Sequence, residues 1–479
     1  MTRIRTPSLK PSFVVFSGGS ACNHIAQAFH KVGHEDVAYI LGISDNGGST
    51  SEILRVLGGP SIGDLRSRLT RLIDMVDASE ERGAIKDLLS YRLSNDPEQV
   101  KDEWAAIVEG RHRLWCRIPA EKKETIRGFL THFNGEILKR AHKRFNFCNG
   151  SVGNFFLTGA RLFFGSLEAA LFLFSAITGI SHITSVLPVI STNHMATIAA
   201  QLQNGDTILG QCEISHPSTL PYQQMVNPID AFMQLGDEPI PTTTNKWMDD
   251  KGDQQQQQHT SNLFFSKHAD QPLAAPIRRL YYINEYGQEI YPVPNAKVIT
   301  QLSTKTTLVY SIGSLFTSIV PSLILRNVGH AIAHSHTLTH KILLLNGSND
   351  RETHGYSALD FILTITAALN ESQKTDCRRA FYQTNMAQKQ DLCSSSDSGY
   401  GSFTNSPPPF PDQLFHPSAP HQFITHLVYL DQGDIPVDVA AIEKLGIRCL
   451  CIQGSRCAST GKPIYNDTHL THTLHSLCT

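Results

Sequence analysis

The sequence has no excess of charge of either sign and no uninterrupted apolar stretch long enough to span a membrane. Its 41 basic and 43 acidic residues leave a net charge of −2, so the composition carries no electrostatic footprint for nucleic acid or a membrane surface. The most apolar segment, 162–180, contains Gly165 and Glu168 and falls short of the roughly 20 residues that a spanning helix needs. We expect this segment to be a helix buried inside the fold, and we expect neither a nucleic-acid nor a membrane partner.

The sequence also lacks a C-x-x-C pair, and we do not expect its first residues to be a secretory signal. The ten cysteines include no C-x-x-C pair. Cys449 and Cys451 lie in a run typical of a strand, where buried thiols are more common than a metal site. The first 12 residues are polar, and the apolar run behind them is too short for a secretory signal. These features predict a cytoplasmic protein.

No Ser-His-Asp or Cys-His arrangement typical of nucleophilic catalysis stands out. Four histidines, His330, His334, His336 and His340, are spaced to suit one helix face. Because no acidic residue or cysteine is close to them in the sequence, a polar helix surface is favoured over a metal site.

What the sequence does contain is a series of short apolar runs separated by polar loops. A hydrophobic content of 41% supports a sizeable core, and the length suits about three average domains or one large α/β body with insertions. The runs predict strands at 13–16, 37–43, 185–190, 207–214, 307–312, 342–345, 425–430 and 448–452, and a folded pattern that resumes at 278–283. The first two runs are each followed by a polar loop and a helical pattern, which predicts a parallel sheet whose ligands bind at the carboxyl ends of the strands.

Composition divides the chain into one α/β domain and several other segments. The domain is expected over 13–235, 276–370 and 422–456, with a charged helical excursion at 75–147 that has Trp104, Trp115, Phe129 and Phe133 as packing anchors. Residues 236–275 contain a run of five glutamines, and 372–421 are rich in Ser and Pro. Both segments predict disordered insertions, and 457–479 is expected to be a C-terminal tail.

A glycine turn follows the first predicted strand. Gly18, Gly19 and Ser20 precede a helical pattern, and such a turn can direct backbone N–H groups and a hydroxyl toward phosphate. The turn lacks both the full G-x-G-x-x-G spacing and the G-K-[ST] ending, so an ordinary structural turn is also open. Asn23, which completes a Gly-Gly-Ser-x-x-Asn loop, is included among the candidate nucleotide-binding residues.

Two aspartates and an arginine follow the second predicted strand. Asp45 and Asp64 are oxygen ligands suited to magnesium, which typically uses one or two carboxylates and substrate phosphates. Asp64 could instead be only a charge at a helix N-terminus. Arg66 could pair with a diphosphate, although an isolated arginine is more often part of a surface ion pair.

Further candidates come from two later loops. Asn149 and Asn154 can hydrogen-bond a ribose or a base, although turn and capping roles are equally common. A second anion-binding loop is predicted just before a helix, with Gly313, Ser314, Thr317 and Ser318 as its candidate ligands.

Together these motifs resemble the 2-phospho-L-lactate transferase family (CofD-like, UPF0052), and the loop series is most similar to its branch of bacterial gluconeogenesis factors (the YvcK-like proteins). The matching pieces run in order over about 13–365 and 424–452: Gly18-Gly19-Ser20, 44–49, 63–66, 152–154, 186–188, Gly205-x-x-x-x-Gly210-Gln211, 313–318 with Pro321, Glu352-Thr353 and 355–360.

The resemblance implies a Rossmann-like core that binds a nucleotide diphosphate or a nucleotide sugar. In the transferase branch, a phospholactate-type group moves from a guanosine-diphosphate-linked donor to a deazaflavin alcohol, with magnesium. The metal aspartates would be Asp45 and Asp64, and Arg66 would neutralise phosphate charge. Asn46 stands where a second carboxylate often sits, which weakens the case for full catalysis.

Two functions from different classes therefore stay open. One is a magnesium-dependent transferase, and the other is a nucleotide-sugar-binding factor that takes part in carbon metabolism and cell morphology through partners. An activity on a different phospho-acid is not excluded by the sequence. The oligomeric state also stays open, a homo-oligomer included.

Overall fold

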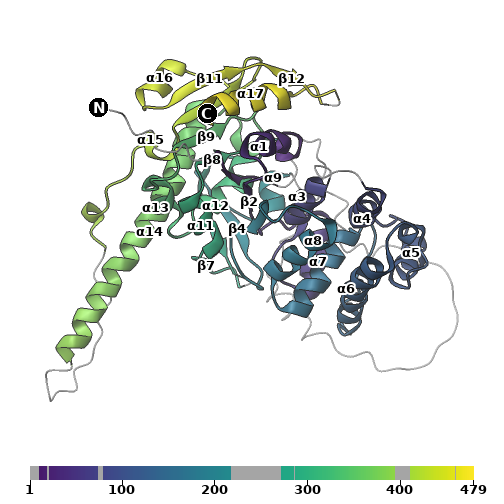
Figure 1. Ribbon diagram of the computed structural model, residues 1–479. Coiled ribbons are helices and arrows are strands. Elements are labelled where there is room, and N and C mark those ends of the chain that lie inside the picture. Colours follow the sequence, from purple (N-terminus) through teal and green to yellow (C-terminus); the bar gives the residue numbers. More distant parts are fainter. Residues whose placement is uncertain are drawn as a thin grey trace, which may run out of the picture.

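A seven-stranded, fully parallel sheet lies at the centre of the computed structural model (Figure 1), which describes residues 10–18, 21–73, 79–216, 271–284, 286–393, 410–458 and 460–478. The strand order is β11-β10-β9-β8-β1-β2-β3. The strands are β1 (Phe13–Phe16), β2 (Val37–Leu41), β3 (Ser185–Pro188), β8 (Thr307–Tyr310), β9 (His340–Leu344), β10 (His426–Leu430) and β11 (Arg448–Ile452). All residues of β1, β2 and β8 are buried, as expected of parallel strands covered on both faces. The predicted parallel α/β core is confirmed.

The order in which strands are added to the sheet reverses at β1. The chain passes from β1 to β2 and β3 on one side, then returns to add β8, β9, β10 and β11 on the other. Phe16, the last residue of β1, lies opposite Ile40 of β2 and Tyr310 of β8. In open parallel sheets, ligands bind at such a switch point, beside the carboxyl ends of the strands.

Helices cover both faces of this sheet, and two small antiparallel sheets accompany it. The helices outside the excursion are α1 (Ala26–Gly33), α2 (Gly48–Leu57), α3 (Gly63–Ile73), α9 (Gln211–Ser215), α11 (Ala296–Thr304), α12 (Val320–Leu323), α13 (Val328–Ala333), α14 (Ala358–Cys393), α15 (Pro420–Phe423), α16 (Val439–Lys444) and α17 (Asp467–Cys478). The four-stranded sheet, in the order β5-β4-β6-β7, comprises β4 (Thr197–Leu202), β5 (Thr207–Leu209), β6 (Ile277–Ile283) and β7 (Glu289–Ile290), and the other pairs β12 (Gly454–Arg456) with β13 (Pro463–Tyr465).

The excursion predicted at 75–147 is helical, and with the next two helices it forms a lobe beside the sheet (Figure 1). Its helices are α4 (Glu80–Ser90), α5 (Gln99–Val108), α6 (Ala120–Leu138), α7 (Val152–Phe164) and α8 (Leu167–Thr178). Trp104 packs edge-on against Phe133 and Phe155, with ring centroids 6.0 and 5.1 Å away. Aromatic contacts between α5, α6 and α7 therefore hold the lobe together.

Several sequence-based boundaries differ from the structure. The apolar segment 162–180 forms parts of two helices, because Gly165 ends α7 in a left-handed conformation and the Ser166 side chain caps α8 by accepting from the Ala169 N–H. The strand expected at 207–214 stops at Leu209, since Gly210 has φ +86° and α9 begins at Gln211. Across the described residues, no helix is long and apolar enough to cross a membrane.

The predicted insertion at 372–421 begins inside a helix. Ser372 is buried, and its hydroxyl donates to the Leu325 carbonyl oxygen while its oxygen accepts from the Gly329 N–H. The polar residues at the start of this segment therefore anchor α14 to α13 rather than marking disorder. Residues 394–409 lie outside the described residues, as do 236–270 of the other predicted insertion.

The C-terminal part of the chain also differs from expectation. The tail predicted at 457–479 contains β13 and α17, and α17 buries Leu470 and Leu474. Lys31 of α1 and Asp467 form an ion pair at 2.8 Å. The thiol of Cys451 is exposed rather than buried, because β11 is the edge strand of the sheet.

Candidate functional site

The loops that follow β1 and β8 meet at the switch point. A Cβ atom built on Gly18 would lie 2.5 Å from the Ser318 hydroxyl oxygen, and one built on Gly313 would lie 3.8 Å from the Gly18 backbone nitrogen. Only glycine at position 18 allows this approach. The structure thus joins the two predicted anion-binding loops, whereas Gly19 and Ser20 lie outside the described residues.

The loop after β2 brings the segments of the two predicted metal ligands together. Asp45 accepts a 3.0 Å hydrogen bond from the Gly47 N–H through Oδ1. Its Oδ2 lies 3.6 Å from a Cβ built on Gly63, the residue before Asp64. Asp64 is in the first turn of α3, and α2 begins directly after Gly47 without a side-chain cap.

This donor set fits magnesium better than a metal held entirely by the protein. The described parts of the chain contain no group of three or more His, Cys, Asp or Glu side chains that could hold a metal ion. Two carboxylates from adjacent segments leave the remaining positions of an octahedral ion to water and substrate phosphate, which is the usual arrangement for Mg²⁺. Asp45 and Asp64 would supply those carboxylates.

In the family that the sequence motifs resemble, a carboxylate is common at the position of Asn46. Here the Asn46 side chain positions α9. Its Oδ1 accepts from the Cys212 N–H at 2.9 Å. Gly210 has φ +86°, and a Cβ there would lie 2.8 Å from the Asn46 Nδ2. The amide therefore holds the loop after β2 against the start of α9.

Arg66 and Asn154 are in direct contact. The Arg66 Nε donates to the Asn154 Oδ1 at 3.2 Å, and the Asn154 Nδ2 donates to the Ser49 hydroxyl at 2.9 Å. Burial and the nearby charge of Arg92 lower the pKa of Arg66 to about 10, while Asp64 acts in the opposite direction. Arg66 therefore stays protonated at neutral pH, beside the start of α2.

Asn149 has the role of a turn residue that also lines a cavity. It has φ +56°, its Nδ2 donates to the Asn95 Oδ1 at 3.1 Å, and its carbonyl oxygen accepts from Arg92 at 3.1 Å. With Gly48, Ser49 and Arg92 it lines a cavity of about 310 Å³ next to the N-terminus of α2. Asn23 is less directly placed, since its Nδ2 donates to the Ser67 hydroxyl of α3 at 3.3 Å.

The second predicted anion-binding loop already holds a carboxylate of the protein itself. The N–H groups of Phe316 and Thr317 donate to the Glu352 Oε2 at 3.0 and 3.1 Å. The Thr317 and Ser215 hydroxyls donate to its Oε1 at 2.6 and 2.7 Å. Burial, together with the charge of Asp350, raises the pKa of Glu352 to about 7. Thr317 therefore bonds Glu352, and of this loop Gly313 and Ser318 lie against Gly18.

Arg68 is a notable residue that the sequence analysis did not single out. Its side chain is completely buried, its Nη2 donates to the Ser17 hydroxyl at 3.3 Å, and its guanidinium lies 4.5 Å from the centre of the Tyr39 ring. Its Nε and Nη1 have no hydrogen-bond partner in the described structure. An unpaired buried charge is costly, and this one contacts Ser17, the residue before Gly18. The sequence signal was an arginine on the apolar side of an amphipathic helix.

The histidine cluster divides between two elements. His330 lies in α13 and stacks on His334 with ring centroids 4.4 Å apart, whereas His340 begins β9. None of them belongs to a metal-binding group within the described ranges.

The parallel sheet, its switch point and the polar loops at its strand ends define a Rossmann-like α/β protein. The family model described as 2-phospho-L-lactate transferase CofD matches residues 13–399. The chain therefore belongs to the CofD family, which confirms the resemblance drawn from the motifs.

The chain is also similar to a yeast protein in sequence and to two solved structures in fold. The chain is 39% identical over 464 residues to uncharacterized protein YNL011C of Saccharomyces cerevisiae, covering 92% of this chain and 95% of that protein. Two crystal structures of protein BH3568 from Bacillus halodurans, one of them described as a member of the UPF0052 family, have the same fold, each with a TM-score of 0.56. They are 14% and 13% identical to this chain, covering 97% and 98% of it and 99% of their own chains.

Proposed function

We propose that this protein binds a nucleotide diphosphate at the carboxyl ends of β1, β2 and β8 and acts as a transferase of the 2-phospho-L-lactate transferase type. The observation that carries the proposal is the approach of Asp45 to the start of α3, which bears Asp64 and Arg66. Two carboxylates and a protonated guanidinium, beside a helix N-terminus and a glycine turn, suit a metal-bound diphosphate. Membership of the CofD family supports the same reading.

In the proposed reaction, a phospholactate-like group moves from a guanosine-diphosphate-linked donor to a deazaflavin-type alcohol. The alcohol oxygen bonds to the phosphorus of that group, the bridging P–O bond breaks, and guanosine monophosphate leaves. Asp45 and Asp64 would hold magnesium, which would supply neutralisation of phosphate charge during the transfer. Arg66 is held by Asn154, which orients its cation toward the same charge. The proton of the alcohol passes to solvent.

Calorimetry with guanosine diphosphate, with and without magnesium, tests this proposal. The unaltered protein should bind the nucleotide more tightly with magnesium, and Asp45→Asn should remove that gain. The variant should still fold, because an asparagine oxygen can accept the Gly47 N–H as Asp45 does. Asp206→Asn, on an exposed turn, is the matched control. Equal binding by the Asp45 variant and the control would exclude Asp45 as a metal ligand.

A nucleotide-sugar-binding factor without turnover is the second candidate function. The observation that favours it is Asn46, which supplies an amide where a second carboxylate is common and bonds the Cys212 N–H. One negative charge fewer weakens metal binding at the loop. Tight binding of a uridine diphosphate sugar that is recovered unchanged would support this function. Release of a nucleoside monophosphate from a guanosine-diphosphate-linked donor would support the transferase.

A further inference from the structure

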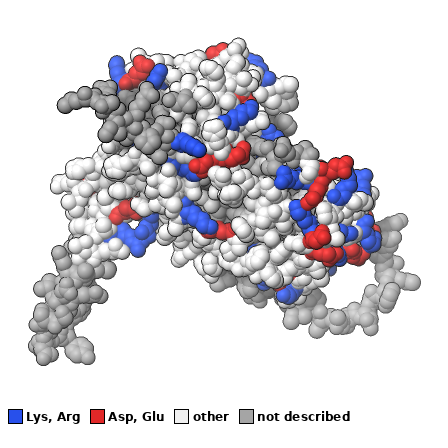
Figure 2. Space-filling view, viewed as in Figure 1, with Lys and Arg blue, Asp and Glu red and all other residues white. Residues whose placement is uncertain are grey.

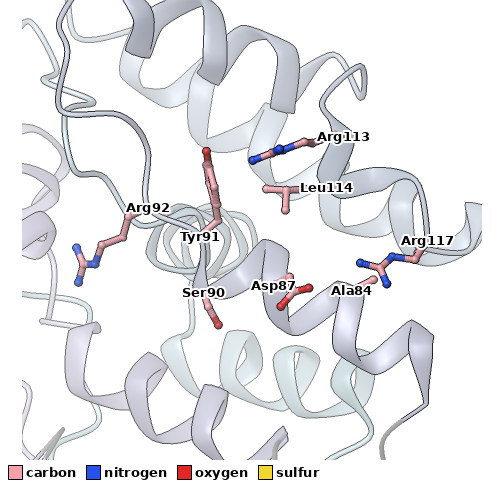
Figure 3. A pocket seen from close by; sticks show the side chains of 8 residues that line it. All are labelled: Ala84, Asp87, Ser90, Tyr91, Arg92, Arg113, Leu114 and Arg117. Atoms are coloured by element: carbon pink, nitrogen blue, oxygen red, sulfur yellow. The ribbon is translucent and has the colours of Figure 1, made fainter.

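An open cavity lies on the helical lobe, between the end of α4 and the 3-10 turn at Arg113–Trp115 (Figure 3). It has a volume of about 720 Å³ and is lined by Ala84, Asp87, Ser90, Tyr91, Arg92, Arg113, Leu114 and Arg117. Figure 3 shows the side chains of Arg113 and Arg117 on one side of the cavity and those of Asp87 and Tyr91 on the other. Three guanidinium groups therefore border one cavity that has a single carboxylate in its lining.

Other arginines of the same lobe form ion pairs with carboxylates, whereas the arginines of this cavity form none within the described residues. On the face shown in Figure 2, basic and acidic side chains lie interleaved over the lobe. Arg111 pairs with Glu109 at 2.5 Å, and Arg127 pairs with Glu124 at 2.8 Å. Among the residues that the structure describes, no carboxylate lies within ion-pair distance of any of the three cavity arginines. Their charge is thus available to a ligand.

The lining keeps an excess of positive charge, because three arginines are opposed by one carboxylate. Both oxygens of Glu103 are engaged, Oε1 by the Tyr91 hydroxyl at 2.5 Å and Oε2 by the Ser94 N–H at 2.7 Å. Burial lowers the pKa of His112, which lies beside Tyr91, and thereby favours the neutral imidazole. Asp87 is the one carboxylate in the lining.

The cavity lies next to the candidate site at the carboxyl ends of β1, β2 and β8, which we call the strand-end site. Arg92 lines both this cavity and the smaller one beside Gly48 and Ser49, and its charge lowers the pKa of Arg66. In Figure 3 its guanidinium points away from Arg113 and Arg117. The two sites therefore have Arg92 in common.

We propose that this cavity binds a phosphate or carboxylate group through Arg113 and Arg117. Guanidinium groups recognise both anions in a forked geometry, and the side chains of Tyr91 and Leu114 offer apolar contact for the carbon atoms next to the anion. The anion belongs either to a separate small molecule or to an extended arm of the ligand that occupies the strand-end site. The proposal does not depend on the transferase function.

Calorimetric titration of the full chain with sodium tripolyphosphate, in magnesium-free buffer, tests the proposal. Arg113→Gln together with Arg117→Gln should weaken binding by about tenfold or more, as expected when charge-assisted hydrogen bonds are removed. Arg111→Gln, which removes an ion-paired arginine of the same surface, should leave the affinity unchanged. Arg113 and Arg117 are both exposed, and thermal unfolding checks that each variant is folded.

Repeating the titration with guanosine diphosphate present distinguishes the two sources of the anion. Simultaneous binding indicates a separate molecule, whereas competition that is lost in the double variant indicates one ligand that spans both sites. Equal tripolyphosphate affinity of the double variant and the unaltered protein would overturn the proposal. So would an equal loss in Arg111→Gln, because the effect would then reflect net charge alone.

Discussion

The hydroxyl of Thr317 donates a 2.6 Å hydrogen bond to the carboxylate of Glu352, 35 residues further along the chain. Four donors therefore surround this carboxylate: the Thr317 hydroxyl, the N–H groups of Phe316 and Thr317, and the Ser215 hydroxyl. Glu352 thereby connects the loop after β8 to α9, the helix that Asn46 also contacts. The elements around the strand-end site are held together by polar contacts that span much of the chain.

Glu352 should make the stability of the protein depend on pH. Its pKa is raised by burial to about 7 in the folded state, above the ordinary value of a glutamate. The folded protein therefore binds the carboxyl proton of Glu352 more tightly than the unfolded chain does. The stabilising contribution is full below about pH 4 and is lost as the pH rises through about 7. Urea unfolding of the unaltered protein and of Glu352→Gln at pH 5 and pH 8 measures it. The loss on raising the pH should be smaller in the variant, and an unchanged loss would assign it to other groups.

Truncation of the same side chain should be more damaging. Glu352→Ala leaves two buried N–H groups and two hydroxyls without their acceptor, which costs about 2–4 kcal/mol in the free energy of unfolding. Glu352→Gln keeps an oxygen acceptor and should cost less. Equal unfolding midpoints for the two variants would show that the hydrogen bonds contribute little.

Gly18→Ala should disrupt the meeting of the two loops. The new Cβ would lie 2.5 Å from the Ser318 Oγ and 2.9 Å from its Cβ, and such overpacking typically costs about 1–3 kcal/mol. Because the clash is with one side chain, adding Ser318→Gly should recover much of the loss, as a double-mutant cycle can measure. Gly83→Ala is the control, since Gly83 lies inside α4 with nothing within 4 Å of the new Cβ. No recovery in the double variant would place the strain elsewhere.

Arg68→Met should separate folding from anion binding. The substitution removes a buried charge that has no carboxylate partner in the described structure and keeps an apolar chain of similar length over the Tyr39 ring. Replacement of buried charges by apolar residues is often neutral or stabilising by about 1–4 kcal/mol. We therefore expect unchanged or higher stability together with weaker guanosine diphosphate binding. Lower stability with normal binding would show that Arg68 is purely structural.

Asn154→Ala should lower both stability and nucleotide affinity. It removes the acceptor for the Arg66 Nε and the donor to the Ser49 hydroxyl, and loss of buried hydrogen bonds typically costs about 1–3 kcal/mol. A guanidinium that is no longer held should bind diphosphate less well. Arg55→Gln, in an exposed ion pair with Glu52 in α2, is the control. Affinity measured by calorimetry that is equal in both variants would contradict an orienting role for Asn154.

The strands of the central sheet could be predicted from the sequence because each is a short, largely apolar run, and β1, β2 and β8 are buried throughout. β4 was missed, since Thr197–Leu202 contains two alanines and a glutamine and lacks the β-branched pattern of its neighbours. The continuation of α14 through the polar sequence beyond 372 was missed for another reason. Ser372 is satisfied by the backbone of residues more than 40 positions away, a partner that no local pattern reveals.

The candidate site was predictable to the extent that its residues follow strands directly. Gly18, Asp45 and Gly313 do so, and the parallel topology then brings their loops together. Roles that depend on distant partners were not predictable. Thr317 was expected to contact phosphate, but its acceptor is Glu352, and the contacts of Arg68 with Ser17 and Tyr39 could not be read from its position on the apolar side of a helix. Sequence patterns locate these loops, whereas the pairing of their polar atoms depends on the tertiary structure.

The position of β1 in the sheet has a consequence for synthesis of the chain. Phe13–Phe16 pairs with Thr307–Tyr310. During synthesis, β1 therefore leaves the ribosome before β8, which is made almost 300 residues later. Until then β1 has one open edge of wholly apolar sequence, which is prone to pairing with other chains. A nascent protein that is released before β8 is complete would carry that edge into solution, together with half of its ligand site.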